Sequence, residues 1–234
     1  MKKAPFTLIY GDEDMIAVNK AAGLLVAADR WDIEAPRLDL LIQKELPKID
    51  PLCQKLYAVH RIDKDTSGIL ITARSAESEA FLKNEFKLRH TEKYYLAILT
   101  GVPEKQSGII ETSVFRDGHS RIRFAASADL SKGKYACSRY KVLRVYGRYA
   151  LVLFKIDTGR THQIRLHARF IGCPIVGDPL YGKKEAEWKP YGMMLHAYRL
   201  CVALPSTREK AVFTAPPPRK FRTVLRLLQT QGNG

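Results

Sequence analysis

The feature that most constrains the fold of this chain is a polar hexapeptide, DKDTSG at 63–68, set between two short apolar segments. The segment before it is LYAVHRI and the segment after it is ILITAR, and both are typical of buried strands. Gly68 permits a tight backbone, and the hydroxyls of Thr66 and Ser67 can hold a loop by bonding to its amides. The pattern predicts two strands joined by a turn that displays the carboxylate of Asp63.

Other segments alternate between strand and helix patterns along the 234 residues, 46% of which are apolar. Short strands are predicted at FTLIY, MIAVNK and KYYLAILTG, and residues 109–157 have β character throughout. Helices are predicted at 38–46, 76–89, 161–172 and 219–229. No linker marks a second domain. We therefore expect one α+β domain spanning 1–234, with a mixed, mostly antiparallel central sheet flanked by helices and loops around an active-site cleft.

The predicted helix at 161–172, THQIRLHARFIG, has the clearest boundaries and an amphipathic pattern. Thr161 is a candidate N-cap and Gly172 is placed to end the helix. His162, Arg165 and Arg169 recur at spacings of three and four residues, so they form one polar stripe beside an apolar one. The pattern predicts that one stripe docks on the core and the other faces a cleft, although a solvated surface helix would have the same pattern.

Charge is strongly unbalanced: 39 Lys and Arg stand against 24 Asp and Glu, a formal net charge of +15. Such an excess favours a polyanionic partner, because cations set against phosphates release condensed counterions. Nucleic acid is the first candidate and an anionic membrane surface the second, while a merely basic soluble protein remains open. Basic stretches occur at 85–90, 116–123 and 218–222, and we expect some to follow an RNA backbone. For 218–222 a solvated helix is the preferred interpretation.

The four cysteines are widely spaced and form no C-x-x-C pair, which argues against a zinc site or a disulfide framework. The first residues have no apolar stretch long enough for a signal peptide, and no run approaches the ~18 apolar residues of a membrane span. These features predict a soluble cytoplasmic protein that needs no membrane.

The acidic turn permits several interpretations, of which an ordinary capped turn is the plainest. A calcium loop of the EF-hand type fails because Arg74 stands where the bidentate Glu is required. The D-x-D-x-T pattern of aspartyl phosphotransferases would make Asp63 the nucleophile and Asp65 the acid or base. Such enzymes hold Mg²⁺ with further acidic residues, and downstream only a lone Asp178 is available.

The flanking residues favour a third interpretation. HRIDKDTSGILITA closely resembles the signature of the RluA family of pseudouridine synthases, in which His-Arg-(Leu/Ile)-Asp precedes a Thr-Ser-Gly turn and an apolar strand. EKYYLAILTG at 92–101, GRTHQIRLHARFIGCPIVGDPLYG at 159–182 and LHAYRL at 195–200 resemble further family motifs in the family's order. YGDEDMIAVNKAAGLLV resembles the start of the catalytic domain, with Ala21-Ala22 where Pro-Ala is usual. The resemblance runs from about residue 8 to 218.

The resemblance implies an enzyme that isomerises specific uridines of ribosomal or transfer RNA without a cofactor or metal. Asp63 would be the nucleophile, Arg165 the cation beside it, and Tyr95 an aromatic group against the base, with Tyr94 on the opposite sheet face. Arg61 would fill the space left by the flipped base, and a contact with phosphate or with Asp65 is the alternative. The full set of expected substrate-binding residues is His60, Arg61, Thr66, Ser67, Gly159, Arg160, Thr161, His162 and Gln163.

The target RNA is less constrained. Many relatives carry an S4-type RNA-binding domain before the catalytic one, whereas here the resemblance begins almost at the first residue. We therefore expect the catalytic domain to recognise RNA by itself, which suits a small accessible element such as a stem-loop, and no obligate protein partner is indicated. A non-catalytic RNA-binding or RNA-folding protein on the same scaffold is the main alternative.

Overall fold

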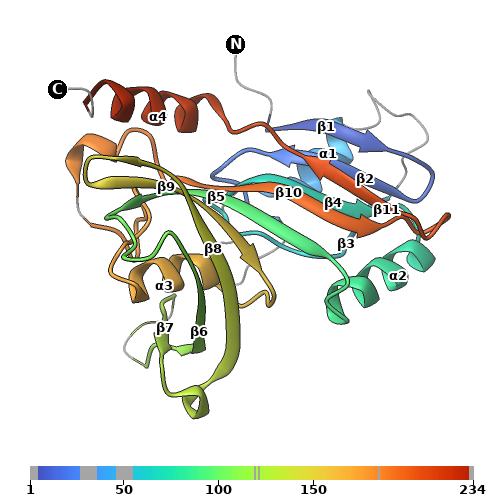
Figure 1. Cartoon of the computed structure of the whole chain (residues 1–234). Coiled ribbons are helices and arrows are strands. Elements are labelled where there is room, and N and C mark those ends of the chain that lie inside the picture. The colour runs from blue at the N-terminus through green and yellow to red at the C-terminus, as the bar shows by residue number, and fades with distance from the viewer. Residues whose placement is uncertain are drawn as a thin grey trace. The chain divides into compact units, whose positions relative to one another are not determined.

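The computed structural model describes residues 5–26, 36–45, 55–118, 120, 122–183 and 185–231, and Figure 1 shows the course of the chain. The chain divides into two compact units. Unit 1 comprises Met1–Glu92 and Ala197–Pro216, and unit 2 comprises Lys93–His196 and Pro217–Gly234. Both units combine strands with helices, so the α+β prediction is confirmed. The expectation of a single domain over 1–234 stays a prediction.

Unit 1 is built on a sheet in which β1, β2, β4 and β10 are neighbours in that order, with β11 paired to β10 and β3 paired to β4. The ladders β1–β2, β2–β4, β3–β4 and β10–β11 are all antiparallel. The bounds of these strands are β1 Phe6–Gly11, β2 Met15–Lys20, β3 Tyr57–Ala58, β4 Ser67–Ala73, β10 Leu195–Ala203 and β11 Lys210–Thr214. The strands predicted on both sides of the acidic turn are thus present, although the first of them is only two residues long.

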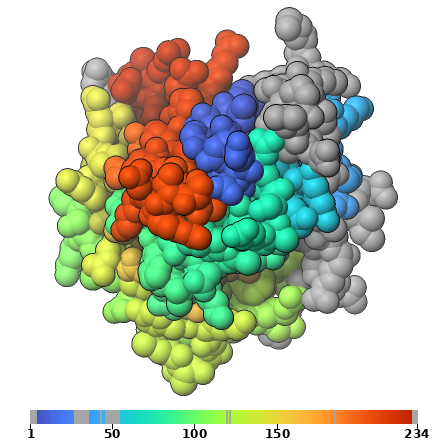
Figure 2. Space-filling model, turned by 90° about the vertical axis from the view of Figure 1, so that its right-hand side faces the viewer, coloured from blue at the N-terminus to red at the C-terminus, as the bar shows by residue number. Residues whose placement is uncertain are grey.

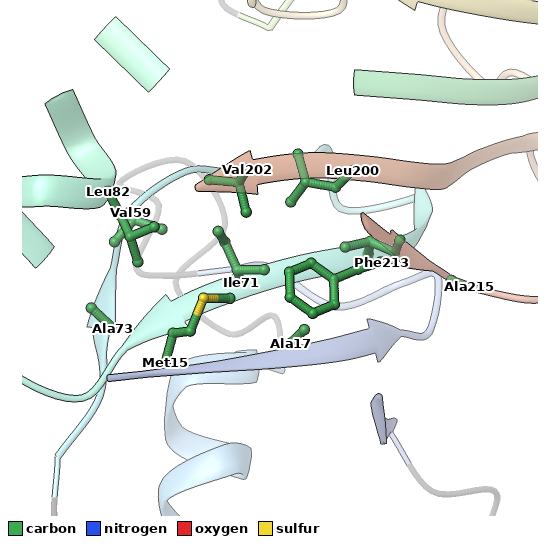
Figure 3. Packing of buried hydrophobic residues seen from close by; sticks show 11 residues of the cluster. Met15, Ala17, Val59, Ile71, Ala73, Leu82, Leu200, Val202, Phe213 and Ala215 are labelled. Carbon is green, nitrogen blue, oxygen red and sulfur yellow. The ribbon is translucent and has the colours of Figure 1, made fainter. Parts of the chain in front are cut away.

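The core of unit 1 forms where alternate side chains of neighbouring strands meet (Figure 3). Met15 lies opposite Ala73, and Ala17 lies opposite Ile71, so these residues share one face of the sheet. All seven residues of β4 are buried, which is the pattern of a strand covered on both faces. The buried members of this cluster are Met15, Ala17, Val59, Ile69, Ile71, Ala73, Leu82, Leu200, Val202, Phe213 and Ala215.

Two helices belong to unit 1. Helix α1 spans Leu38–Glu45, and helix α2 spans Ala76–Lys87, close to the predicted ranges. Helix α2 begins where the hydroxyl of Ser75 accepts a hydrogen bond from the backbone N–H of Ser78 at 3.0 Å. Figure 2 shows the surface of unit 1 where β1 lies beside β11.

In unit 2 the strands are neighbours in the order β5, β9, β8, β6, β7, and their ladders are all antiparallel. This part of the 11-stranded sheet is called the unit 2 sheet below. Its strands are β5 Glu92–Thr100, β6 Ser107–Arg116, β7 Phe124–Ser127, β8 Lys134–Tyr146 and β9 Tyr149–Ile156. Helix α3, Gln163–Phe170, packs against β6, β7 and β8. Helix α4, Arg219–Gln231, packs against β8. The prediction of a C-terminal helix at 219–229 is thus confirmed.

Among the described helices, none is long and apolar enough to cross a membrane. Four positions used in the sequence-based predictions lie outside the described residues: Leu46 at the end of the first predicted helix, Cys53, and His119 and Arg121 within the basic stretch 116–123.

Gly68 is the last residue of the acidic turn, and its backbone conformation and close packing require glycine. Its φ of +116° lies in a region that L side chains rarely adopt, and an added Cβ would lie 2.2 Å from the carbonyl oxygen of Ala197. We expect Gly68→Ala to lower the free energy of unfolding by at least about 2 kcal/mol, measured by chemical denaturation. Gly11→Ala is the control, because its Cβ would meet nothing within 4 Å. Equal stability of the two variants would contradict this account.

Candidate active site

The acidic turn of unit 1 presents Asp63 at its first position. The backbone N–H of Thr66 donates to the carbonyl of Asp63 at 3.1 Å, which closes the turn. The N–H of Gly23 donates to the carbonyl of Lys64 at 2.8 Å and so joins the turn to the loop that follows β2. Asp63 and Asp65 are half-buried. Two backbone hydrogen bonds therefore hold the turn that carries both carboxylates.

Lys20, the last residue of β2, lies beneath this turn and is completely buried. Its ammonium group donates to the carbonyls of Ala21, Leu24 and Lys64 at 2.9, 2.9 and 3.0 Å. Burial lowers the pKa of Lys20 to about 7, although the negative charges of Asp65 and Asp63 act to raise it. Three carbonyl acceptors match the three N–H donors of the ammonium form, so the geometry selects the charged form. Lys20 thus fixes the turn and sets a cation near both carboxylates.

The sequence did not single out Lys20, because a lysine at the end of a strand ordinarily reaches solvent. The only sequence signal was its place in the NKAAG segment that resembles the start of the family's catalytic domain. Its role depends on the loop 21–24 and the acidic turn meeting at one point, which is a property of the tertiary structure.

The expected substrate-binding residues of this turn differ in their accessibility. Arg61 is exposed, whereas Thr66 and Ser67 are only 2% and 4% exposed. His60 is half-buried: its Nε2 accepts from the backbone N–H of Ile71 at 3.0 Å, and its ring stacks on Phe86 at 4.5 Å. Arg61 is therefore the residue of this group that extends into solvent, and the other three are part of the support of the turn.

Helix α3 of unit 2 begins at Gln163, and its N-cap is His162 with a left-handed φ of 58° and no side-chain cap. The predicted N-cap at Thr161 is therefore wrong, whereas Gly172, with a φ of 74°, follows the helix end as predicted. A left-handed non-glycine residue costs about 1 kcal/mol and persists where its surroundings hold it, which is common at functional sites.

The expected two-stripe pattern of α3 is also wrong. Six consecutive residues, 163–168, are buried, so the helix is enclosed on all sides over this stretch. Arg165 is 3% exposed, while Arg169 is exposed. The polar residues at 163–168 are accommodated because protein groups satisfy them, which a sequence pattern does not reveal.

Gln163 is one of these satisfied polar residues. Its Nε2 donates to the carbonyl of Cys137 and the hydroxyl of Ser138, both at 2.9 Å. Its Oε1 accepts from the hydroxyl of Thr158 at 2.7 Å and the backbone N–H of Arg160 at 3.0 Å. All of its usual hydrogen-bonding positions are used within the protein, so Gln163 anchors the first turn of α3 to β8.

His167, absent from the expected site residues, is a second anchor of the same helix. Its Nδ1 lies 2.9 Å from the hydroxyl of Ser138, and its Nε2 lies 2.9 Å from the hydroxyl of Thr112. The side chain is completely buried, and burial lowers its pKa to about 4. The neutral ring therefore ties α3 to both β8 and β6.

Arg165 forms a two-pronged ion pair with Asp178 inside unit 2. Its Nε donates to Oδ2 at 2.8 Å and its Nη2 to Oδ1 at 2.7 Å, and the two side chains are 3% and 0% exposed. Asp178 also accepts from the backbone N–H groups of Leu180 and Tyr181. Burial acts to raise the pKa of Asp178, but the hydrogen bonds and charge of Arg165 outweigh it and the pKa is lowered. The guanidinium plane is thus fixed in orientation.

Tyr181 holds the same guanidinium from one face, with its ring 5.0 Å from the Arg165 carbon Cζ. Its hydroxyl accepts from the backbone N–H of Phe124 at 2.9 Å and also lies 2.9 Å from Nδ1 of His162. Tyr181 therefore joins Arg165, the strained N-cap of α3 and the start of β7.

Tyr95 lies on the face of the unit 2 sheet that α3 covers. Residues paired across neighbouring strands lie on the same face of a sheet, and Tyr95 pairs with Phe154, which in turn pairs with Tyr140. Tyr140 shares its face with Ser138, two residues away on β8, and Ser138 contacts His167 of α3. Tyr94 faces the other way, with the Lys155 ammonium 5.4 Å from its ring centre. The prediction that Tyr94 and Tyr95 lie on opposite faces of the sheet is confirmed.

Residues 159–162 form the segment that leads into α3. Gly159 and Thr161 are exposed, while Nε of Arg160 donates to the carbonyl of Tyr135 at 2.9 Å. Tyr95 and Arg165 thus belong to unit 2 with this segment, and Asp63 belongs to unit 1 with His60, Arg61, Thr66 and Ser67. Within the described part of the chain, no group of three or more His, Cys, Asp or Glu residues could hold a metal ion.

The structure is that of an α+β protein. In unit 1 the acidic turn is held by the buried Lys20, and in unit 2 the guanidinium of Arg165 is oriented by Asp178. Residues 14–170 match the family described as RNA pseudouridylate synthase, so the chain belongs to this family and is an isomerase that acts on RNA. Family membership confirms the resemblance seen in the sequence and sets aside the phosphotransferase interpretation.

Individual relatives agree with this assignment. The chain is 37% identical over 221 residues to ribosomal large subunit pseudouridine synthase D of Borreliella burgdorferi, an alignment that covers 93% of this chain and 67% of the relative. The solved structure of human RNA pseudouridylate synthase domain containing 1 has a TM-score of 0.75 at 26% identity and covers 97% of this chain and 95% of that one. Human RNA pseudouridylate synthase domain containing 4 has the same fold, with a TM-score of 0.76 at 22% identity and coverages of 95% and 92%.

The buried imidazole of His167 makes stability depend on pH in a defined window. Its folded pKa of about 4 is below the ordinary 6.5, so as pH falls the unfolded chain binds the proton first. We expect the wild type to lose about 3 kcal/mol of unfolding free energy from this group between pH 6.5 and 4, and nothing further below that. Denaturation of His167→Gln and wild type across this window measures the difference. Parallel profiles would contradict the assignment.

Asp178→Asn should show how strongly Arg165 depends on its carboxylate. The variant removes the buried carboxylate that binds the guanidinium through two hydrogen bonds, and we expect a loss of about 3 kcal/mol in unfolding free energy. Asp157→Asn is the matched control, since Asp157 pairs with the exposed Arg139 at 3.2 Å and should cost less than about 1 kcal/mol. Calorimetric melting of both variants gives the comparison, and similar losses would refute the difference.

Proposed function

We propose that Asp63 is the nucleophile with which this enzyme isomerises uridine to pseudouridine in RNA. The observation that carries the proposal is the acidic turn itself: it lies within the family match at 14–170, and the buried cation of Lys20 holds it from below. A positive charge nearby favours the ionised, nucleophilic form of a carboxylate.

The reaction breaks the bond between C1′ of the ribose and N1 of the base and forms a bond between C1′ and C5. The carboxylate of Asp63 adds either to C1′ or to C6 of the base, and it departs when the new bond is complete. C5 releases its hydrogen as a proton and N1 takes one up, so product and substrate are isomers. The balance requires no oxidant, reductant or co-reactant.

Arg165 and Tyr95 supply the supporting chemistry in this proposal. The guanidinium of Arg165 is already oriented by Asp178 and Tyr181, so it needs little reorganisation when negative charge shifts between the carboxylate and the base during the reaction. Tyr95 stacks on the target base and assists removal of the C5 proton. Arg61 is exposed beside the nucleophile and fills the space that the flipped uridine leaves.

The substrate we propose is a uridine in a stem-loop of ribosomal or transfer RNA, without an obligate protein partner. Loop bases leave their stack at low cost, and an accessible hairpin can be recognised by shape and phosphates. The name of the Borreliella burgdorferi relative refers to the large ribosomal subunit. The free thiols of Cys137, Cys173 and Cys201 suit the reducing cytoplasm where such RNAs are found.

The experiment follows tritium release from RNA that carries C5-tritiated uridine. Asp63→Asn should lower release by roughly a thousandfold or more, because the amide is a poor nucleophile, while filter binding of the same RNA stays close to wild type. Asp65→Asn is the matched control from the same turn and should retain activity within about tenfold.

Appreciable release by Asp63→Asn would show that the nucleophile is misassigned. Loss of activity in Asp65→Asn alone would point in the same direction. A wild-type protein that binds RNA but releases no tritium from any pool of transcripts would instead support the non-catalytic alternative.

A further inference from the structure

Helix α4 carries a stripe of arginines that the proposed isomerisation does not use. Phe221, Val224 and Leu228 are buried, while Arg219, Arg222 and Arg226 are exposed. Spacings of three and four residues place these arginines along one side of the helix (α4 in Figure 1). The helix sequence RKFRTVLRLLQTQ contains no Asp or Glu, so the stripe is a surface of one sign.

Within the described residues, these three arginines have no carboxylate partner. None of them forms an ion pair in the part of the chain that the structure describes, whereas on α2 Lys83 pairs with Glu79 at 2.7 Å. Like charges four residues apart, as in Arg222 and Arg226, repel each other and slightly weaken a helix. The stripe therefore costs some helix stability within the free protein, and a bound polyanion would relieve that repulsion.

Strand β8, against which α4 packs, adds further cations. Lys141 and Arg144 are exposed, and they pair with Leu153 and Leu151 of β9, so both lie on one face of the sheet. This face is opposite the one that carries Ser138, to which α3 is anchored. The cations of β8 are therefore on the other side of the unit 2 sheet from Tyr95 and Arg165.

We propose that the arginines of α4, together with Lys141 and Arg144, form a second RNA-binding surface that holds the phosphate backbone flanking the modified uridine. The inference rests on the proposed function, because it concerns the same RNA substrate. Guanidinium groups bind phosphate oxygens in pairs, and a stripe of one sign matches a polyanion that has one charge per nucleotide. This surface, here called the α4–β8 surface, anchors the RNA and takes no part in bond breaking.

Such an anchor acts on RNA affinity and leaves the chemical step unchanged. The KM for a long RNA that reaches the α4–β8 surface depends on these arginines, whereas kcat does not. A minimal stem-loop that is too short to reach the surface is handled equally well with or without them. Each lost phosphate contact also reduces the salt dependence of binding by a predictable amount.

The test compares Arg219→Gln/Arg222→Gln/Arg226→Gln with wild type in binding and in tritium release, using one long and one minimal RNA. For the long RNA we expect affinity to fall roughly tenfold or more at 100 mM salt, and the slope of log K against log salt to lessen by about 2 to 3. The kcat at saturation and all values for the minimal RNA should remain within about twofold of wild type. Unchanged affinity for the long RNA would overturn the proposal.

Two further variants show whether a loss of RNA affinity comes from the α4 arginines themselves, from altered helix packing or from lower net charge. Arg219→Lys/Arg222→Lys/Arg226→Lys keeps the charges but not the paired phosphate contacts, so its loss of affinity for the long RNA should be clearly smaller than that of the Gln variant. A loss equal to that of the Gln variant would indicate a packing role and overturn the proposal. Lys44→Gln/Lys83→Gln/Lys210→Gln removes three exposed cations of unit 1 and should have little effect on affinity. An equal loss there would reduce the effect to net charge and also overturn it.

Binding measurements also distinguish this inference from the proposed function. If wild type releases no tritium but its affinity for the long RNA still depends on the α4 arginines, the catalytic proposal fails and the α4–β8 surface stands. Vesicles of phosphatidylglycerol serve as the other polyanion. If the Gln variant loses vesicle binding but keeps its affinity for the long RNA, the surface is a membrane contact and the proposal is wrong.

Discussion

Arg165 and Asp178 form a buried ion pair around which much of unit 2 is arranged. Two charges almost completely removed from water are tolerated only because each prong of the guanidinium meets a carboxylate oxygen and the remaining capacity of the carboxylate is used by backbone N–H groups. The pair orients a cation in advance, which is the arrangement that stabilises developing charge most effectively. The anchors of α3, Gln163 and His167, keep the helix that carries the arginine against its sheet.

Unit 1 also contains a buried cation whose hydrogen-bond donors are satisfied by protein groups, in this case the ammonium of Lys20. The ammonium of Lys20 is buried under the acidic turn and donates to three backbone carbonyls, so it fixes the loop and supplies positive charge close to both carboxylates of the turn. In both units a basic residue that looks solvent-exposed in the sequence is interior. In both units a decisive hydrogen-bond partner comes from another segment of the chain, Lys64 for Lys20 and Asp178 for Arg165.

The sequence-based predictions succeeded where they relied on a strong helix or strand period and failed where they relied on the exposure of polar residues. Elements with a strong period were placed well: the strand at KYYLAILTG corresponds to Glu92–Thr100, the helix at 76–89 to Ala76–Lys87, and the C-terminal helix at 219–229 to Arg219–Gln231. The alternation of a strand likewise separated Tyr94 from Tyr95 correctly. The predictions for 161–172 failed at the N-cap and at the polar stripe, because buried polar residues have the same spacing as a solvated face.

The sequence by itself determined the α+β class, the strand–turn–strand that carries Asp63, and the family, because these depend on local periodicity and on polar residues at fixed spacing. The tertiary structure alone decided that Lys20, Gln163, Arg165 and His167 are interior and which groups satisfy them. The physical reason is that a polar side chain can be buried only where partners from other segments converge on it, and no local pattern records that convergence.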